Sequence, residues 1–467
     1  MKKAEAVFRS VLEKITPGDS KVKETQDVLM EIEKTTVDVI KPFGLKHTLA
    51  GSFLRDTWLA DKLEFDIFIL FPESVPRDRL EKQGLELGSK ITRSLKGCYE
   101  IAYAEHPYIK AKIGEYTVDF VPCYDVKDPG NIKSAVDRTP HHNRYLLKNL
   151  TPELSPQVRL LKKFCKGIGV YGSDLKVEGF SGYLTELLII HYRTLKNLML
   201  EAAEWEAGKV FIDLNGHHKK PVDAKKIYPG QPLIVIDPVD KGRNVAAALS
   251  PGNFEKFRYA CASFLKSPDE KFFTRGKGQV NLQSLRKSIG GRGTKLLCVW
   301  FTRPGVVDDV LFPQLRKSAR RLRGMITEAE FAVMGHDVWC DIGGCAILVE
   351  MEVWCLPNVR KLTGPPLFSK THSGQFIKKY RGRARMWVEG MNWVAEVRRE
   401  YTDVDRLIRK SLKKGRKSLE ADGIASYVAA GLASGFTLMS EKEIYSKAKK
   451  NRDFAGFLAE YFKKNIV

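Results

Sequence analysis

The sequence contains no long apolar run. No stretch approaches the roughly 18 consecutive apolar residues that a helix needs to span a bilayer. The first 15 residues are polar and helix-like, without the apolar core of a secretory signal. These absences predict a cytoplasmic protein that has no membrane anchor.

Cysteine is scarce, and its spacing excludes the common zinc motifs. The 467 residues include eight cysteines, with no CxxC pair and no Cys/His ligand spacing. We therefore expect free, buried thiols in a reducing compartment and no zinc site. Internal repeats and low-complexity tracts are also absent. A hydrophobic fraction of 43% and a charged fraction of 29% predict folded domains, about two to four at this length.

Acidic residues are in deficit. Asp and Glu number 56 against 78 Lys and Arg, so the formal charge is +22 and the isoelectric point lies near 9.5. This balance favours a polyanionic partner, nucleic acid first of all, over an ordinary basic protein.

The excess cations are concentrated in the C-terminal third. Between Val359 and Lys417, 17 Lys and Arg stand against 5 Asp and Glu, with Tyr and Trp interleaved. A second cluster has the spacing that aligns cations along one side of a helix: Arg316, Lys317, Arg320, Arg321 and Arg323. Aromatic residues among cations favour an RNA-binding surface over a merely solvated face.

Hydrophobic periodicity divides the chain into three parts. We expect an α/β domain over residues 1–145, a mainly helical domain over 146–266 and an α+β region over 267–467. In the first part the pattern predicts a helix over 20–40, a short helix after Gly51-Ser52, and strands over 63–71, 99–104 and 116–121.

The later parts carry clear helix and strand signals as well. In the central part we predict helices opening at the Ser155-Pro156 cap and at residues 180–182, a strand over 233–236, and a helical pattern from Asn244. Beyond it we expect strands that alternate with basic helices, over 295–301, 331–341 and 346–356.

Two acids share one face of the first predicted strand. Glu64 and Asp66 are two residues apart and project to the same side, whereas the other side is an apolar row of Leu63, Phe65, Ile67 and Ile69. Asp119, in the strand over 116–121, supplies a third oxygen ligand if the two strands are neighbours. Three carboxylates suit Mg²⁺, and two such ions activate a terminal hydroxyl and stabilise a leaving pyrophosphate.

A lone Glu-x-Asp also fits a pair of solvated acids on an edge strand. The preceding Gly51-Ser52 favours catalysis, because it stands 12 residues before the acids at a predicted helix N-terminus. There, backbone amides and the Ser52 hydroxyl can hold a triphosphate. These features together predict metal-dependent nucleotidyl transfer.

Five motifs together resemble the archaeal, class I CCA-adding enzymes. They read Gly51-Ser52-Phe53-Leu54-Arg55-Asp56-Thr57-Trp58-Leu59, Leu63-Glu64-Phe65-Asp66, Val118-Asp119-Phe120-Val121-Pro122, Arg138-Thr139-Pro140-His141-His142 and Asp237-Pro238-Val239-Asp240-Lys241-Gly242-Arg243-Asn244. The motifs cover roughly the first 260 residues, with compatible order and composition beyond them. The resemblance implies a DNA polymerase β-like nucleotidyltransferase head, a helical central domain, and a C-terminal body and tail that grip the tRNA acceptor stem.

The activity implied by the resemblance is stepwise, template-independent addition of C, C and A to the 3′ end of tRNA from CTP and ATP. By position, Glu64, Asp66 and Asp119 are the implied ligands of two Mg²⁺ ions, and Asp119 also favours the attacking 3′-hydroxylate. The resemblance places Ser52 and Arg55 near the triphosphate of the incoming nucleotide.

Further nucleotide contacts are implied at His142, Lys162, Tyr171 and Arg243. An arginine presents only donors, so Arg243 can read acceptors on cytosine and adenine. Each contact has a structural alternative: Lys162 fits a helix-surface cation, Tyr171 a turn aromatic, and Arg243 a helix cap or a partner of Asp237 or Asp240. His141 adjoins His142, which leaves open the imidazole that faces the nucleotide.

Other functions are compatible with the same head. Polymerase β-like heads also occur in poly(A) polymerases, terminal uridylyltransferases and 2′-5′ oligoadenylate synthetases, so the fold alone does not name the product. A catalytically silent RNA-binding module would lack a carboxylate, whereas all three acids are present here. The basic C-terminal region favours docking of a fixed duplex over synthesis of a long tail. The oligomeric state stays open, with a homodimer as one option.

Overall fold

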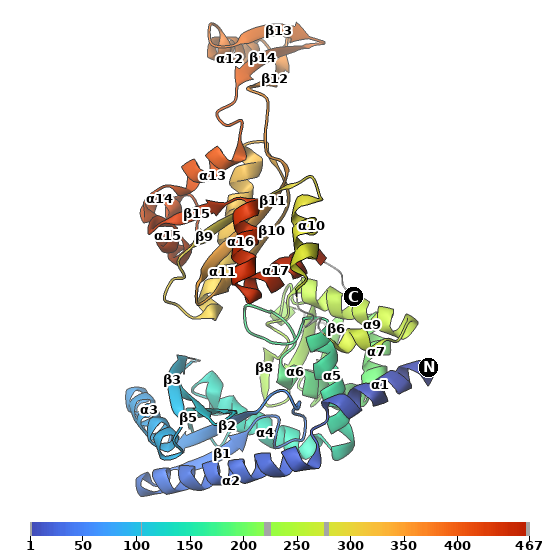
Figure 1. Ribbon diagram of the computed structural model, residues 1–467, viewed down its shortest axis with the longest axis vertical. Helices are drawn as coiled ribbons and strands as arrows, with labels where there is room; N and C mark the ends of the chain where they lie inside the picture. The colour runs from blue at the N-terminus through green and yellow to red at the C-terminus, as the bar shows by residue number, and fades with distance from the viewer. Residues whose placement is uncertain (1, 104, 219–225, 275–279, 464–467) are drawn as a thin grey trace. The chain divides into compact units, whose positions relative to one another are not determined.

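The structure is a computed structural model that describes residues 2–103, 105–218, 226–274 and 280–463 (Figure 1). These residues fall into two compact units, one within residues 1–277 and the other within residues 278–464. The first unit contains a five-stranded sheet, a three-stranded sheet and a group of helices. The second contains a four-stranded sheet, a three-stranded sheet and further helices.

The N-terminal part of the first unit is built on the five-stranded sheet, whose strand order is β1-β2-β5-β4-β3. β2 and β5 run parallel, and the other neighbouring pairs are antiparallel. The strands are β1 (Lys46–Ala50), β2 (Glu64–Phe71), β3 (Cys98–Tyr103), β4 (Pro107–Ile113) and β5 (Tyr116–Tyr124). The helices α2 (Asp19–Ile40) and α3 (Arg77–Ser94) share a hydrophobic core with this sheet and appear in blue beside it in Figure 1.

Alternation along β2 divides its side chains between the two faces of the sheet. Phe65, Ile67 and Ile69 are buried in the core with α2 and α3, which confirms the predicted apolar row. Glu64 and Asp66 therefore project to the opposite face. The helix predicted over 20–40 is α2, so this part of the sequence analysis is also confirmed.

The sheet contains two strands that the sequence pattern did not predict, β1 and β4. β4 lies between the strands expected over 99–104 and 116–121, where the sequence analysis placed no strand. Its Ile109 and Ala111 are buried while Lys110 and Lys112 are exposed, which is the alternation of a half-buried strand. The strand expected over 99–104 corresponds to β3, and Ala104 lies outside the described residues.

The short helix expected after Gly51-Ser52 is wrong. Residues 51–56 form a turn, and the Thr57 amide donates to the Ser52 carbonyl across it at 2.9 Å. Gly51 and Asp56 have left-handed backbone conformations, with φ of 94° and 51°. A right-handed helix does not accommodate such residues. This segment therefore presents a tight turn to a ligand instead of a helix N-terminus.

The rest of the first unit is mainly helical. Its elements are α1 (Lys2–Ile15), α4 (Arg138–Asn149), α5 (Ser155–Gly167), α6 (Gly182–Tyr192), α7 (Leu195–Ala203), α9 (Pro251–Lys266), β6 (Val210–Asp213), β7 (Leu233–Asp237) and β8 (Asp240–Asn244). α1 packs with the central helices, and Phe8 stacks on Phe264 at a centroid distance of 5.3 Å. β7 confirms the strand expected over 233–236. The helix expected from Asn244 begins only at Pro251, after the unpredicted strand β8.

Two predicted helix starts differ in how they are capped. Ser181 caps α6 as expected, since its hydroxyl accepts from the Leu184 amide at 3.0 Å. Ser155 is instead the first residue of α5, and its hydroxyl donates to the Arg55 carbonyl at 3.0 Å. The bond thereby joins α5 to the turn after β1. Short 3₁₀ helices complete the unit: η1 (Lys41–Phe43), η2 (Pro129–Asn131), η3 (Ala135–Asp137), η4 (Pro152–Leu154) and η5 (Glu270–Phe273).

The second unit is centred on a four-stranded sheet of order β10-β11-β9-β15. Its strands are β9 (Lys295–Phe301), β10 (Ala332–Asp341), β11 (Gly344–Val353) and β15 (Phe436–Met439). One hydrophobic cluster joins this sheet to α11 (Asp308–Glu328), α13 (Val404–Leu412), α14 (Arg416–Ala421) and α15 (Ser426–Ala433). A second cluster joins it to α10 (Leu282–Gly290), α16 (Glu441–Lys450) and α17 (Arg452–Lys463). The three strands predicted in this region are confirmed as β9, β10 and β11.

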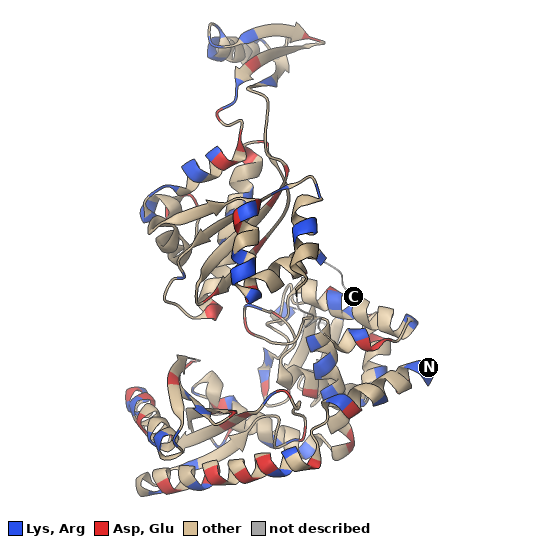
Figure 2. Cartoon of the chain, viewed as in Figure 1, with Lys and Arg blue, Asp and Glu red and all other residues tan. Residues whose placement is uncertain are grey.

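A smaller sheet of order β12-β14-β13 extends from the second unit. It is formed by β12 (Val359–Pro366), β13 (Arg385–Glu389) and β14 (Asn392–Arg398), with α12 (Lys370–Tyr380) packed against it. The basic cluster predicted on a helix lies on α11, where Lys317, Arg320 and Arg323 are exposed. Figure 2 shows further blue bands of Lys and Arg on α10 and α16.

The thiol and membrane expectations have clear outcomes. All eight cysteines are free, as expected, and six are buried, but the expectation of buried thiols is wrong for Cys98 and Cys355, which are exposed. Within the described ranges, no helix has the length and apolar character required to cross a membrane.

Candidate active site

Two of the predicted acids lie directly opposite each other. Asp66 on β2 and Asp119 on β5 are paired in the register of these parallel strands, and Glu64 is paired with Thr117. The condition set by the sequence, that the two strands be neighbours, is therefore met. The Oδ1 atom of Asp119 is buried and has no hydrogen-bond partner.

Burial and mutual repulsion raise the pKa of both aspartates. Burial raises the pKa of Asp66, and the charge of Glu64 raises it further. Burial and then the charge of Asp66 raise the pKa of Asp119 to about 7. Two buried carboxylates that carry such shifts are stabilised by a proton or by a cation.

The acid face fits a divalent cation. Within the described part of the chain, no three His, Cys, Asp or Glu side chains form a group that could hold a metal ion. Glu64 is half exposed and pairs with Lys62 at 2.5 Å. The Asp66 and Asp119 carboxylates nevertheless offer oxygen ligands, one of them an orphaned buried atom, to a hard cation.

A cavity of about 230 Å³ opens beside these acids. Six of the predicted site residues line it: Ser52, Arg55, Glu64, Asp66, Lys162 and Tyr171. Asp119, His142 and Arg243 are not among the lining residues. The turn after β1 approaches the acids closely, because a Cβ atom on Gly51 would lie 2.7 Å from Asp66 Oδ2. Glycine is therefore required at that position.

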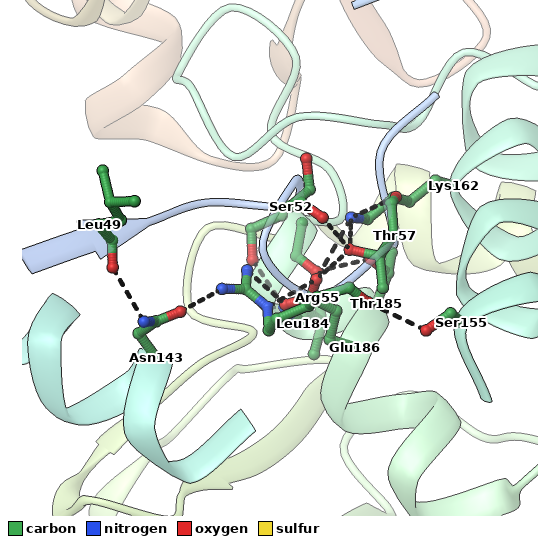
Figure 3. A network of polar contacts seen from close by, with 12 residues as sticks. Leu49, Ser52, Arg55, Thr57, Asn143, Ser155, Lys162, Leu184, Thr185 and Glu186 are labelled. Carbon is green, nitrogen blue, oxygen red and sulfur yellow. Dashed lines mark hydrogen bonds and ion pairs between the residues drawn. The ribbon is translucent and has the colours of Figure 1, made fainter. Parts of the chain in front are cut away.

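A fully buried glutamate that the sequence analysis did not single out organises one wall of the cavity (Figure 3). Glu186 Oε1 accepts from Thr57 Oγ1 at 2.6 Å, and its Oε2 accepts from Arg55 Nη2 at 3.1 Å. Lys162 Nζ donates to the same Oε1 at 3.4 Å. Arg55 Nη1 also donates to Asn143 Oδ1 at 2.6 Å. Two predicted nucleotide contacts therefore share one anion.

The charges in this wall shift each other's pKa values. Burial lowers the pKa of Lys162, and the charge of Glu186 opposes that effect. Burial by itself raises the pKa of Glu186, but the charges of Lys162 and Arg55 outweigh it, and the net direction is downward. The prediction of Lys162 as a helix-surface cation is wrong, since its side chain is 5% exposed.

A second buried acid, Asp237, gathers the remaining predicted contacts. Its carboxylate accepts from Arg243 Nη1 at 2.7 Å and from the Tyr183 hydroxyl at 3.1 Å, and it lies 2.8 Å from His142 Nε2. The His142 ring stacks on Tyr183 with centroids 4.1 Å apart. Tyr183 itself lines the cavity, so this group adjoins it.

Two alternatives left open by the sequence are decided by this geometry. Arg243 pairs with Asp237, while Asp240 pairs with Arg138 at 2.9 Å. His141 is buried with Nε2 2.9 Å from the Val126 carbonyl, whereas His142 faces the group around Asp237. The imidazole nearer the cavity is therefore that of His142.

Of the two site residues that the sequence analysis missed, Glu186 and Tyr183, only Glu186 stands out in the sequence. Glu186 is the one charged residue between Ser181 and Ile190, a segment that is otherwise almost wholly apolar. A lone acid inside an apolar helix requires a partner when it is buried. The sequence does not say which partner, because the cations come from segments 131 and 24 residues away.

Three family models match consecutive stretches of the chain. The model described as nucleotidyltransferase domain matches residues 21–142, and that of tRNA nucleotidyltransferase, second domain, matches residues 156–274. The model described as CCA-adding enzyme, C-terminal domain, matches residues 292–440. The first model lies on the five-stranded sheet, so the predicted polymerase β-like nucleotidyltransferase head in a chain of mixed helices and sheets is confirmed.

Several curated proteins are similar over nearly the whole chain. The CCA-adding enzyme of Methanocaldococcus jannaschii is 37% identical over 87% of this chain and 90% of its own length. That of Methanosarcina acetivorans is 34% identical over 97% of both chains. That of Thermococcus gammatolerans is 36% identical over 94% of this chain and 98% of its own.

Among solved structures, the Cid1 poly(U) polymerase is similar with a TM-score of 0.46 and 14% identity, over 58% of this chain and 98% of that one. The curated relatives are more informative, because 34% to 37% identity extends across almost the entire sequence. Together with the three consecutive family models, this similarity shows that the chain belongs to the family of CCA-adding enzymes, which are tRNA nucleotidyltransferases.

Proposed function

We propose that the chain adds C, C and A in sequence to the 3′ end of tRNA, from CTP and ATP, in the cytoplasm and without a nucleic-acid template. The observation that carries this proposal is the pairing of two largely buried aspartates, Asp66 and Asp119, which form no ion pair within the described residues and lie beside a cavity walled by cations. An enzyme of this family needs that combination, because a metal ion and a triphosphate must meet at one place.

The aspartates and Glu64 are the proposed ligands of Mg²⁺, in two ions. When bound, these ions activate the terminal hydroxyl of the RNA and stabilise the leaving pyrophosphate. Asp66 and Asp119 stand opposite each other in the strand register, so their carboxylates project from neighbouring positions on the same face of the sheet. For Glu64 to bind a metal ion, its half-exposed side chain would have to release Lys62, with which it now forms an ion pair.

The cavity walls support the binding of a nucleoside triphosphate. Arg55, Lys62, Lys162 and Lys166 contribute positive charge, and Ser52 contributes a hydroxyl. Tyr171 completes the wall that α5 and α6 form. We assign the triphosphate to Ser52, Arg55 and Lys162, since the Ser52 hydroxyl and the Arg55 guanidinium can donate to phosphate oxygens and the charge of Lys162 attracts them.

The group around Asp237 supports base recognition. Asp237 holds Arg243 by one nitrogen, which leaves its other donors for acceptors on cytosine or adenine. His142 and Tyr183 stack on each other and contact the same Asp237 carboxylate. We therefore assign the base to Arg243 and His142, with phosphates of the bound tRNA completing the choice.

The distribution of charge supports tRNA binding by the C-terminal region. The first 145 residues contain 23 Lys and Arg and 23 Asp and Glu, whereas residues 278–467 contain 34 against 19. Duplex RNA is recognised mostly through its shape and backbone, for which such a surplus is suited. We assign the acceptor stem to the basic clusters of this region, α11 among them.

The test is to incubate the purified protein and Mg²⁺ with tRNA that lacks its last three residues. Each nucleotide is offered alone, and CTP is offered with ATP, before the products are sized and sequenced. We expect three added residues that read CCA. Long A or U tails would replace the proposal with a polymerase function, and no extension would replace it with RNA binding alone.

A further inference from the structure

Glu186 occupies an unusual position in the fold. It lies in the middle of α6, its side chain is 1% exposed, and its neighbours along the helix are almost all apolar. A buried carboxylate is costly unless it is paired and hydrogen-bonded. The four hydrogen bonds that it accepts from Thr57, Arg55 and Lys162 therefore indicate its role.

Those contacts come from two other segments of the first unit. From the turn after β1, Thr57 Oγ1 donates at 2.6 Å, and Arg55 donates through Nε at 3.3 Å and Nη2 at 3.1 Å. From α5, Lys162 Nζ donates at 3.4 Å. One carboxylate thus ties the turn, α5 and α6 together around the cavity (Figure 3).

Lys162 depends on this anion more than Arg55 does. Its three N–H donors are all occupied within the protein, by Glu186, the Thr57 carbonyl and the Thr57 hydroxyl. It therefore acts on a bound triphosphate chiefly through its charge. An arginine stays protonated at any accessible pH, whereas a buried lysine loses its proton readily.

The other charged groups around Lys162 do not replace Glu186. Arg55 and Lys62 are cations and repel its charge. Lys166 adds a further cation to the cavity wall, and Tyr171 lines the same wall as a neutral residue. Glu64 and Asp66 also line the cavity, but Lys162 makes no hydrogen bond to them, and in the proposed function both bind cations.

We propose that Glu186 is a positioning residue for the incoming nucleotide, which keeps Arg55 and Lys162 in place and positively charged without touching the substrate itself. This inference rests on the proposed function. The arrangement places two cations against one anion, so a surplus positive charge remains to attract the triphosphate. Without the anion, Lys162 would release its proton. The net charge of the group would stay at one, but it would lie on Arg55 alone, and Arg55 would no longer be held in place.

The test compares the full-length wild type with Glu186→Gln on tRNA that lacks only its final A. Steady-state kinetics are measured at varied ATP, from about pH 6.5 to 9.5. We expect Glu186→Gln to raise KM for ATP about tenfold near pH 7 while kcat changes far less. Above the pH at which Lys162 loses its proton in Glu186→Gln, the KM of this variant for ATP should climb by about tenfold per pH unit. The KM of the wild type should stay constant to higher pH.

Two further variants make the result decisive. Thr185→Val changes the neighbouring buried residue of α6, whose hydroxyl donates to the Gly182 carbonyl of the same helix, and should behave as wild type. In the double variant Glu186→Gln with Lys162→Gln, the climb of KM with pH should vanish, because the titrating group is gone. This variant also removes both charges at once and protects against a failure of Glu186→Gln to fold.

The outcomes separate this inference from the proposed function. If KM and its pH profile match the wild type in Glu186→Gln, or if the climb persists in the double variant, the positioning role is overturned. Equal loss of kcat at every pH would assign Glu186 to folding alone. A wild type that does not add A to this tRNA would overturn the proposed function instead.

Discussion

The first unit contains two kinds of buried carboxylate. Asp66 and Asp119 face each other and form no ion pair within the described residues, and burial raises the pKa of both. Glu186 and Asp237 are more deeply buried, yet the pKa of each is lowered, since the hydrogen bonds and charges of their partners outweigh the effect of burial. Burial alone therefore does not decide the behaviour of an acid in this protein.

The difference separates acids that can bind a metal ion from acids that hold protein side chains in place. A carboxylate whose lone pairs are filled by protein donors holds those donors in fixed positions. A carboxylate left without donors has oxygens to offer to something that the protein does not supply. Asp66 and Asp119 belong to the second kind, which is the physical reason for assigning the metal to them and not to Glu186.

The largest effect is expected from Asp66→Asn, which removes one of the two facing negative charges of Asp66 and Asp119. Transfer should fall at least about 100-fold, because the charge that holds a cation at the reacting atoms is lost. Binding of tRNA should stay within about twofold, since the basic surface is untouched. Single-turnover extension and a binding titration measure the two quantities.

Glu100→Gln is the matched control for Asp66→Asn. Glu100 is an exposed carboxylate on β3 of the same sheet, so its loss should leave both transfer and binding unchanged. Full transfer by Asp66→Asn would remove the metal assignment.

The second effect concerns stability in the absence of metal. The pKa of Asp119 is raised to about 7 in the folded protein from about 4 when unfolded. A raised pKa means that stability is full at low pH and is lost as pH rises from about 4 to about 7. Asp119→Asn escapes this loss, so its advantage over the wild type in free energy of unfolding should grow over that range, by at most about 4 kcal/mol, and its Tm should rise with it.

Thermal melts in a chelating buffer at pH 5 and pH 8 measure this advantage. Added Mg²⁺ provides the control, because it should stabilise the wild type at pH 8 and leave Asp119→Asn nearly unchanged. An advantage that is the same at both pH values would show that Asp119 does not titrate as an isolated buried acid.

The third effect concerns Asp237, a buried acid whose carboxylate oxygens already have partners within the protein. Arg243→Ala removes one of three side-chain partners of Asp237 and leaves the other two in place. Discrimination of CTP and ATP against GTP and UTP should therefore fall about tenfold, with little change in Tm. Lys241→Ala is the matched control, as Lys241 is exposed on the same strand β8. An unchanged nucleotide preference would remove the base-reading role of Arg243.

The fold could be predicted where the core dictates the pattern. β2 and β9 are strongly apolar, and their expected positions match the structure. β8 was missed because only Asn244 of its five residues is buried, so no periodicity marks it. The turn after β1 was taken for a helix because a positive φ at a residue such as Asp56 leaves no trace in the residue types.

The candidate site was predictable in its acids and less so in its cations. The two-residue spacing of Glu64 and Asp66 fixes their shared face by strand geometry alone. The partners of Lys162 and Arg243 depend on helices that meet only in the folded chain. Glu186 and Asp237 could therefore be assigned their partners only from the structure, although both acids stand in otherwise apolar segments.

The smallest effect tests how far a saturated acid tolerates the loss of one donor. Thr57→Val keeps the shape of a fully buried side chain but removes the hydroxyl that donates to Glu186 at 2.6 Å. Arg55 and Lys162 would still neutralise the carboxylate, so the loss should stay near 1 kcal/mol, or about fivefold in KM for ATP. The pH profile should remain that of the wild type, because the charge next to Lys162 is unchanged. A loss as large as that of Glu186→Gln would mean that the hydroxyl, and not the balance of charge, holds the wall of the cavity together.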